Sequence, residues 1–301
     1  MSRTQRMALR GWLADDKCIV PASIFDPLSA RLAEDIGFEL GLVGGSSLAL
    51  TLLGAPDLIL VTASEVADQM LRICQATTMP VLLDADHGFG NALNVIHTVR
   101  SLEAAGVAGL TIEDTLLPLP FGANPSESRL TSVEEGAGKI RAARQARGCD
   151  EMVIIARTSA PQLTSVEDTI VRLQAYEEAG ADALMVVGVR SQADLDAIAA
   201  STRLPLVVAG LRFGVKDPTV LRAARVRILF PGHAPILAAI EATSQALRAM
   251  RSGVSAKDVP GQASAGLLHE VTRRASYDRW IEEFMRLPGK GDHRDVIQPP
   301  Q

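Results

Sequence analysis

Residues 81–113 read VLLDADHGFGNALNVIHTVRSLEAAGVAGLTIE and contain two short apolar runs separated by a helical pattern. The runs, Val81 to Asp84 and Val107 to Glu113, are rich in aliphatic residues and too short to be helices. Between them, in Ala92 to Ala105, apolar residues lie one, four and seven positions after Val95, which places them on one face of a helix. The stretch therefore predicts two parallel strands joined by a helix.

The same alternation extends along the chain in both directions. Further short apolar runs, each bounded by Gly, Pro or acidic residues, are Cys18 to Ala22, Phe38 to Val43, Met152 to Arg157, Ala183 to Val187, Leu206 to Ala209 and Val226 to Phe230. Eight strands alternating with helices predict an α/β fold, a (β/α)₈ TIM barrel. An open, doubly wound sheet would give the same local pattern. However, no Gly-x-Gly-x-x-Gly motif follows the first strand, and eight units favour closure.

Several predicted helices have recognisable starts. Thr62 to Glu65 and Ser132 to Glu135 have the spacing of capping boxes. Asp217-Pro218 is typical of an N-cap followed by proline in the first turn. Each start follows a predicted strand, as a barrel requires.

The chain continues well past the eighth strand. A helical stretch over 235–250 is followed by a break at Ser252-Gly253 and a second helical stretch near 265–285. We expect a single domain over 1–301, made of a barrel over 1–250 and a C-terminal helical extension over 251–301. The apolar residues of the extension need a surface to cover, which is that of a neighbouring subunit or that of the chain's own barrel.

The composition excludes several classes of protein. The 301 residues are 47% hydrophobic, enough to bury a large core. The net charge is −5 and no basic block occurs, so we expect no nucleic-acid partner. The N-terminus lacks the apolar segment of a signal peptide, and no apolar run is long enough for a bilayer, so we expect a cytoplasmic location without membrane contact. The three cysteines are widely spaced and are interpreted as packing residues.

Acidic residues stand at the ends of the third and fourth predicted strands. Asp84 and Asp86 alternate along an extended strand end and so share one side of it, and Glu113 ends the next strand. Clustered carboxylates repel one another unless a cation or a proton intervenes. Oxygen ligands without His or Cys favour Mg²⁺ or Mn²⁺, so we predict a metal site here. The alternative is that these acids cap the helix that begins near Asn91.

Other strand ends are polar as well. The sequence Gly44-Gly45-Ser46-Ser47 follows the second strand, where small residues allow a ligand to approach the backbone closely and bind N–H and hydroxyl groups. An ordinary turn is the other interpretation. Asp57 lies in a loop, and taken alone it would be a solvated turn residue.

The chain resembles the isocitrate lyase/phosphoenolpyruvate mutase superfamily over residues 8–285. The motifs that carry the resemblance are Phe25-Asp-Pro-Leu-Ser-Ala30, Gly44-Gly45-Ser46, residues 84–90, Thr111-Ile-Glu113-Asp114, residues 134–141 and Ile155-Ala-Arg157-Thr158. Within the superfamily, Pro231-Gly232-His233 is similar to the strand-eight pattern of the oxaloacetate decarboxylase branch.

This resemblance implies a barrel whose last helix is exchanged between paired subunits of a homotetramer, a dimer of dimers. It also implies Mg²⁺ bound to an α-keto acid. By position, Asp84 is a metal ligand, and Asp86 and Glu113 hold the ion directly or through water. The residues implied in substrate binding or catalysis are Gly45, Ser46, Ser47, Asp57, Arg157 and His233.

One departure from the superfamily affects the reaction. Its lyases carry a Cys-containing segment after strand four whose thiol is the general acid, but residues 117–129 contain neither Cys nor His. Decarboxylation of oxaloacetate to pyruvate and CO₂ through a metal-stabilised enolate needs no thiol, so we predict a carboxy-lyase. The alternatives are another lyase or hydrolase of the superfamily, such as a 2-methylisocitrate lyase, and a catalytically silent barrel that binds keto acids.

Overall fold

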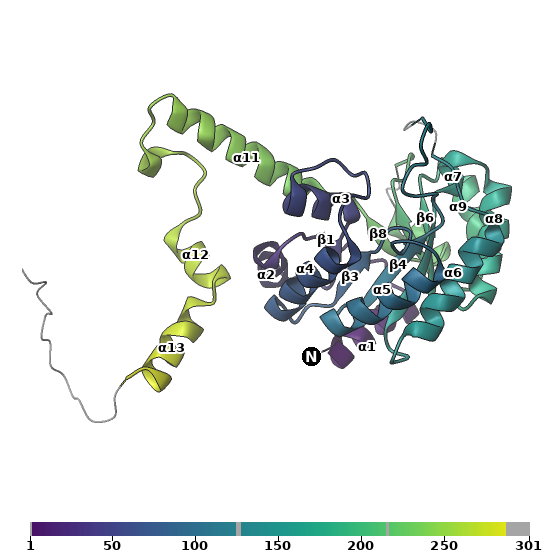
Figure 1. Cartoon of the computed structure of the whole chain (residues 1–301), viewed down its shortest axis with the longest axis horizontal. Helices are drawn as coiled ribbons and strands as arrows, with labels where there is room; N and C mark the ends of the chain where they lie inside the picture. The colour runs from purple at the N-terminus through teal and green to yellow at the C-terminus, as the bar shows by residue number, and fades with distance from the viewer. Residues whose placement is uncertain (1, 125–127, 215–216, 287–301) are drawn as a thin grey trace, which may run out of the picture. The chain divides into compact units, whose positions relative to one another are not determined.

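A computed structural model describes residues 2–124, 128–214 and 217–286 (Figure 1). The chain divides into two compact units, Met1–Gln245 and Ala246–Gln301. The first unit contains a sheet of eight parallel strands in which neighbours along the chain are neighbours in the sheet. The strands are β1 Ala22–Ser23, β2 Gly41–Val43, β3 Val81–Asp84, β4 Gly109–Glu113, β5 Val153–Thr158, β6 Ala183–Val187, β7 Leu206–Ala209 and β8 Val226–Phe230.

The sheet closes on itself just before β1. Ile19 forms a parallel bridge with Ile228 of β8, flanked by backbone hydrogen bonds on both sides. The predicted first strand, 18–22, is wrong in its extent, because the ladder is interrupted before β1 at Pro21, which has no N–H to donate. The predicted barrel is otherwise confirmed, with β2 and β4 each beginning at a glycine two or three residues later than the sequence indicates.

Helices surround the strands of the first unit (Figure 1). They are α1 Ser2–Ala14, α2 Pro27–Ile36, α3 Gly45–Leu48, the π-helix η1 Ala49–Leu53, α4 Ala63–Ala76, α5 Ala92–Ala105, α6 Val133–Ala146, α7 Ala160–Leu163, α8 Val166–Glu178, α9 Gln192–Ala200, α10 Pro218–Ala223 and the first part of α11 Ala234–Arg251. The predicted helix starts are confirmed: Thr62, Ser132 and Asp217 are the N-caps of α4, α6 and α10.

Helix α1 closes one end of the barrel. Its Leu9 and Leu13 pack in one cluster with buried residues from the barrel interior, among them Leu82 and Ile155. A Cβ added to Gly109, at the start of β4, would lie 3.0 Å from Leu9 Cδ2, so α1 lies against the amino ends of the strands. The polar residues that the sequence places after the strands lie at the other end of the barrel, at the carboxyl ends of the strands.

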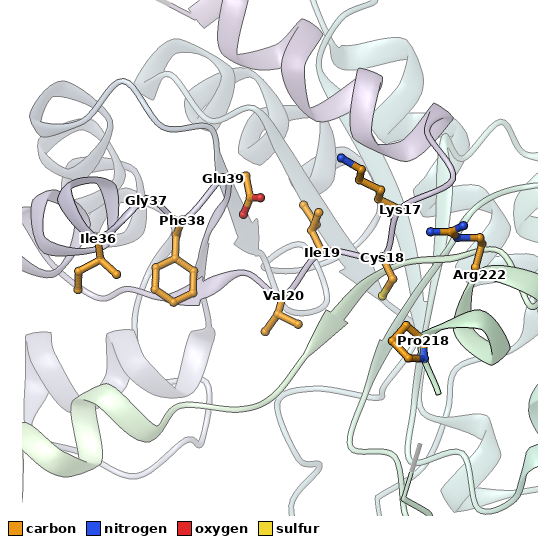
Figure 2. Close-up of a pocket in the computed structure, with 10 residues that line it drawn as sticks. All are labelled: Lys17, Cys18, Ile19, Val20, Ile36, Gly37, Phe38, Glu39, Pro218 and Arg222. Carbon is orange, nitrogen blue, oxygen red and sulfur yellow. The ribbon is translucent and has the colours of Figure 1, made fainter. Parts of the chain in front are cut away.

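A groove lies on the outside of the barrel, between the end of α2 and α10 (Figure 2). Its volume is about 480 Å³. It is lined by Lys17, Cys18, Ile19, Val20, Ile36, Gly37, Phe38, Glu39, Pro218 and Arg222. In a complete (β/α)₈ barrel, the helix that follows the last strand packs on the outside at this position. No residue of α11 lines the groove, and among the 18 residues of α11 only Ile236 is buried.

The second unit contains the 3₁₀ helix η2 Ala256–Asp258, α12 Ala265–Val271 and α13 Arg274–Phe284. The helical stretch predicted near 265–285 is therefore broken in two, at Arg273, whose φ of 58° is incompatible with a continuous helix. Many large apolar side chains of this unit are exposed, including Leu268 and Phe284, which is 71% exposed. Residues 287–301 of the predicted extension lie outside the described residues. No helix in the described part of the chain has the length and apolar character needed to span a membrane.

Candidate functional site

The polar strand ends predicted from the sequence meet in one cavity at the carboxyl ends of the barrel strands. Its volume is about 210 Å³. The predicted site residues that line it are Ser46, Asp57, Asp84, Asp86, Glu113, Arg157 and His233. Apolar side chains form much of the remaining wall, namely Leu42, Ile59, Leu82, Leu117, Met185, Val187, Ala209 and Phe230. Gly44 and Thr111 complete the lining.

The loop after β3 bends sharply to present Asp86. The backbone of Asp86 has a φ of 46°, in the left-handed region, which costs about 1–2 kcal/mol for a residue with a Cβ. The backbone oxygen of Asp86 accepts a hydrogen bond of 2.8 Å from the N–H of Glu113, which ties this loop to the end of β4. Asn91 is the N-cap of α5. The alternative that Asp84 and Asp86 cap this helix is therefore wrong.

Arg157, near the end of β5, joins two of the acids. Its guanidinium forms an ion pair with Asp84 and a second one with Glu113, at 3.4 Å from Nη2 to Oε2. Thr111 Oγ1 donates to Asp84 Oδ1 at 2.7 Å, and Thr115 Oγ1 donates to Glu113 Oε2 at 2.9 Å. Burial alone would lower the pKa of Arg157, but the two carboxylates outweigh this effect and raise it. Arg157 is therefore a permanent positive charge inside the cavity.

The four carboxylates in the cavity carry more negative charge than Arg157 balances. Burial and then the carboxylates of Asp84 and Glu113 raise the pKa of Asp86 well above its usual value. The pKa of Glu113 is raised by burial against the opposing effect of Arg157. Burial and Asp84 also raise the pKa of Asp57. A second cation would relieve this repulsion.

The donor set suits a hard divalent cation that keeps part of its water shell. Among the described residues, no group of three acidic, His or Cys side chains lies close enough together to hold a metal ion by itself. The guanidinium of Arg157 forms ion pairs with two of the acids, Asp84 and Glu113. Mg²⁺ is commonly bound through one or two carboxylates, with waters and substrate oxygens completing its shell. The carboxylates lining the cavity fit that mode of binding rather than a closed protein cage.

The Gly44–Ser47 segment packs against two site residues. A Cβ at Gly45 would lie 2.6 Å from Asp86 Oδ1, and a Cβ at Gly44 would lie 2.3 Å from His233 Cε1. Only glycine leaves room for these side chains. Ser46 lines the cavity, whereas the buried Ser47 lies behind it, with its hydroxyl 2.9 Å from His233 Nδ1. Gly45 and Ser47, predicted to bind substrate, thus support the wall of the cavity without appearing in its lining.

His233 follows β8 and is held on several sides. Its Nδ1 is 2.9 Å from the hydroxyl of Ser23 as well as from that of Ser47, and its ring packs edge-on against Phe230. Burial lowers the pKa of His233, outweighing the carboxylates of Asp84 and Asp57, which raise it. With its pKa lowered, the side chain is a neutral imidazole at neutral pH.

Sequence reasoning missed three hydroxyl residues that support the site, Ser23, Thr111 and Thr115. A signal was available for Thr111, which precedes Glu113 by two positions and so lies on the same side of β4. Ser23 ends β1 and could have been considered as a polar strand end. The hydrogen bond of Thr115 to Glu113 depends on the path of the chain after β4, which no local pattern fixes.

A buried histidine behind the site makes stability depend on pH. His87 is 4% exposed, its Nδ1 lacks a hydrogen-bond partner among the described residues, and Lys139 Nζ donates to its backbone oxygen at 3.2 Å. Burial, and to a smaller extent Lys139, lowers its pKa from 6.5 to about 4. Between these two pH values, the unfolded chain binds a proton at His87 and the folded protein does not.

We expect the free energy of unfolding to fall as the pH is lowered from 6.5 towards 4, because only the unfolded chain binds a proton at His87 in that window. His87→Gln should make this decline shallower. Denaturant unfolding in the presence of a chelator, at several pH values in the window, measures the slope. His97→Gln, on the exposed side of α5, is the matched control and should keep the wild-type slope. Equal slopes for His87→Gln and the wild type would contradict the prediction.

The sequence and the fold are both similar to those of known enzymes. Residues 9–251 match the family described as phosphoenolpyruvate phosphomutase. An oxaloacetate decarboxylase of Rhodopseudomonas palustris (strain BisA53) is 50% identical over 285 residues, covering 95% of this chain and 98% of the relative. A phosphonopyruvate hydrolase in complex with oxalate and Mg²⁺ has a similar structure, with a TM-score of 0.82, 28% identity, and coverage of 95% of this chain and 100% of the other. Oxaloacetate acetylhydrolase with 3,3-difluorooxalacetate also matches, with a TM-score of 0.82, 27% identity, and coverage of 94% and 98%.

Proposed function

This chain belongs to the phosphoenolpyruvate phosphomutase family, part of the phosphoenolpyruvate mutase/isocitrate lyase superfamily, and we infer from that premise that it catalyses the decarboxylation of oxaloacetate to pyruvate and CO₂. The observation that carries the inference is the gathering of four carboxylates and one buried guanidinium in a single cavity, in a chain 50% identical to an oxaloacetate decarboxylase. The size of the cavity, about 210 Å³, suits a small dicarboxylate.

Ser46 and Arg157 would bind the keto-acid end of the substrate, and His233 would bind the carboxylate at the other end. Ser46 offers a hydroxyl at the start of α3, and Arg157 offers a fixed positive charge. His233, which follows β8, would donate a hydrogen bond to the carboxylate that leaves as CO₂. A neutral donor orients this group without the strong ground-state binding of an ion pair, which would have to be given up as CO₂ forms.

The reaction breaks one carbon–carbon bond. The electron pair of that bond forms a double bond to the keto carbon, and the π electrons of the keto group move onto its oxygen, which becomes the oxygen of the pyruvate enolate. A proton from water then adds to the carbon that carried CO₂. Arg157 would stabilise the growing negative charge on that oxygen side. Apolar side chains such as Leu82 and Phe230 line the cavity and would limit the access of bulk water, which would strengthen these interactions.

A divalent cation, Mg²⁺ or Mn²⁺, is the cofactor we propose. Asp84, Asp86 and Glu113 would hold it, directly or through water, and Asp57 would add negative charge nearby. When bound, the ion supplies Lewis acidity to the keto oxygen. The presence of Mg²⁺ and oxalate in the related phosphonopyruvate hydrolase supports this proposal.

A turnover screen tests the function. Purified protein is assayed with Mg²⁺ against oxaloacetate and 2-methylisocitrate, with and without excess chelator. We expect pyruvate from oxaloacetate, no pyruvate or succinate from 2-methylisocitrate, and loss of activity with chelator. Succinate together with pyruvate from 2-methylisocitrate would indicate a lyase of the superfamily. Binding of oxalate without turnover would indicate a silent keto-acid-binding barrel.

We also propose how the chain assembles in the cytoplasm. The groove between α2 and α10 is suited to α11 of a second copy, which would complete each barrel of a dimer, and two dimers would form the tetramer. Exposed apolar residues support this proposal on both sides, with Ile36 at the groove 73% exposed and Leu237 of α11 59% exposed. The extension over 251–301 would add to the same contacts.

We expect Leu237→Asp combined with Ile240→Asp to shift the protein towards smaller species. Each substitution removes about 2 kcal/mol of apolar burial from the proposed contact. Sedimentation velocity over a range of concentrations measures the change. Leu93→Asp, at an exposed leucine of α5, is the control and should leave assembly as in the wild type. An unchanged tetramer in the double variant, or a monomeric wild type, would contradict the assembly.

A further inference from the structure

We propose that Ser23 and Ser47 are positioning residues that fix His233 as the tautomer with its proton on Nε2. The two serines come from different places in the barrel, the end of β1 and helix α3 after β2, and both hydroxyls lie 2.9 Å from the same ring nitrogen. The proposal rests on the proposed function for its effect on catalysis, but its geometric basis is independent of the reaction.

The environment of the two hydroxyls decides which nitrogen carries the proton. Ser23 is 5% exposed and Ser47 is 1% exposed, so neither hydroxyl can rely on solvent. Among the described residues, His233 Nδ1 is the only hydrogen-bond partner recorded for either of them. The two hydroxyls are not hydrogen-bonded to each other. Each serine must therefore use its hydrogen-bonding capacity on the imidazole.

A protonated Nδ1 would leave both hydroxyl hydrogens of the serines buried without an acceptor, which is costly. An unprotonated Nδ1 instead accepts from the serines, whose two hydroxyls share its one lone pair, and the proton of the neutral ring then belongs to Nε2. Burial, which lowers the pKa of His233, supports the neutral ring on which this argument depends. The serines thus select one of the two neutral tautomers.

The selected proton is on Nε2 of His233, on the side of the ring away from the two serines. His233 Nε2 would lie 2.6 Å from a Cβ at Gly44, and Gly44 and His233 both line the cavity. In the part of the chain that the structure describes, no protein group is hydrogen-bonded to Nε2. Its N–H is therefore available as a donor to a carboxylate in the cavity. With the proton on Nδ1, the same nitrogen would present a lone pair and repel that carboxylate.

A double-mutant cycle on steady-state decarboxylation tests the proposal. The Ser23→Ala/Ser47→Ala variant should lower kcat/KM about tenfold or more, in the range found for residues that orient a functional histidine. In a His233→Ala background the same serine substitutions should change kcat/KM less than about twofold, because they act only through the ring. Ser101→Ala on α5 controls for the loss of a serine hydroxyl.

Nitrogen-15 spectra of the histidine rings provide a readout that does not need activity. The chain has only five histidines, and His233→Ala assigns the signal. We expect Nδ1 of His233 to be unprotonated in the wild type, and the serine variant to show a mixture of tautomers. If the double variant does not fold, the single variants Ser23→Ala and Ser47→Ala are measured in its place.

Two results overturn the proposal. One is a protonated Nδ1 in the wild type. The other is a serine effect on kcat/KM that is as large in the His233→Ala background as in the wild type. If the wild type lacks decarboxylase activity, the proposed function fails while the spectra still decide the tautomer, so the two failures are distinguishable.

Discussion

Asp84→Ala is expected to lower the protein-dependent rate of oxaloacetate decarboxylation about a thousandfold, because a bound cation contributes several kcal/mol to the stabilisation of developing charge. Asp84 accepts a hydrogen bond from Thr111 and forms an ion pair with Arg157, so its carboxylate is held in place on both sides. Removing it takes away a predicted metal ligand and leaves Arg157 with only Glu113 as an ion-pair partner.

Free divalent ions also decarboxylate oxaloacetate. The measurement must therefore separate the rate that depends on the protein from the rate that is due to free metal. Rates are therefore measured at fixed Mg²⁺ with increasing protein, and the slope is compared between variants. Asp68→Ala, which removes an exposed carboxylate from α4, changes net charge equally and should keep the wild-type slope. A wild-type slope for Asp84→Ala, with metal binding unchanged in calorimetry, would remove the basis of the proposed reaction.

Arg157→Met is expected to reduce both activity and the stability of the metal-free protein. The variant leaves the partly buried Asp84 and the buried Glu113 without their cation, and breaking a buried pair typically costs about 3–5 kcal/mol. The loss should be largest at neutral to alkaline pH and smaller in acid, because protonation of Glu113 and Asp86, whose pKa values burial raises, relieves the repulsion. We expect decarboxylation to fall at least a hundredfold, from loss of the charge that faces the enolate oxygen.

Denaturant unfolding with excess chelator at two pH values measures the stability effect, and Arg157→Lys is the matched control. Lysine keeps the charge but cannot bridge two carboxylates with a planar fork, so its stability loss should be smaller. Mg²⁺ should stabilise Arg157→Met more than the wild type, because the ion replaces a missing cation. Equal stabilisation by Mg²⁺ in both proteins would show that the ion and the guanidinium do not act on the same carboxylates.

Much of the fold could be predicted from the sequence because its strands are buried on both faces and therefore read as continuous apolar runs. The element that departed most was β1, where Pro21 interrupts the ladder and leaves two paired residues. The break in the second helical stretch was also missed. It depends on the left-handed backbone of Arg273, a residue type that gives no local warning of such a conformation.

The acids of the site could be predicted because parallel strands bring their carboxyl ends to one face, so residues far apart in sequence converge there. The side chains that contact those acids could not be predicted from the sequence. That Arg157 bridges Asp84 and Glu113 depends on the register of β4 beside β5, in which Glu113 is paired with Arg157. The contact between Ser23 and His233 spans 210 positions and depends on barrel closure.

The bridge between Ile19 and Ile228 also constrains how the protein is made. The edge of the sheet at Ile19 stays unpaired while more than 200 residues are synthesised. Its partner, β8, is among the last elements of the barrel to leave the ribosome. Contacts of such long sequence separation slow folding, because a large loop must close before they form. A ribosome-bound chain that stops short of β8 therefore exposes two open sheet edges, and this nascent intermediate is the form most prone to aggregation.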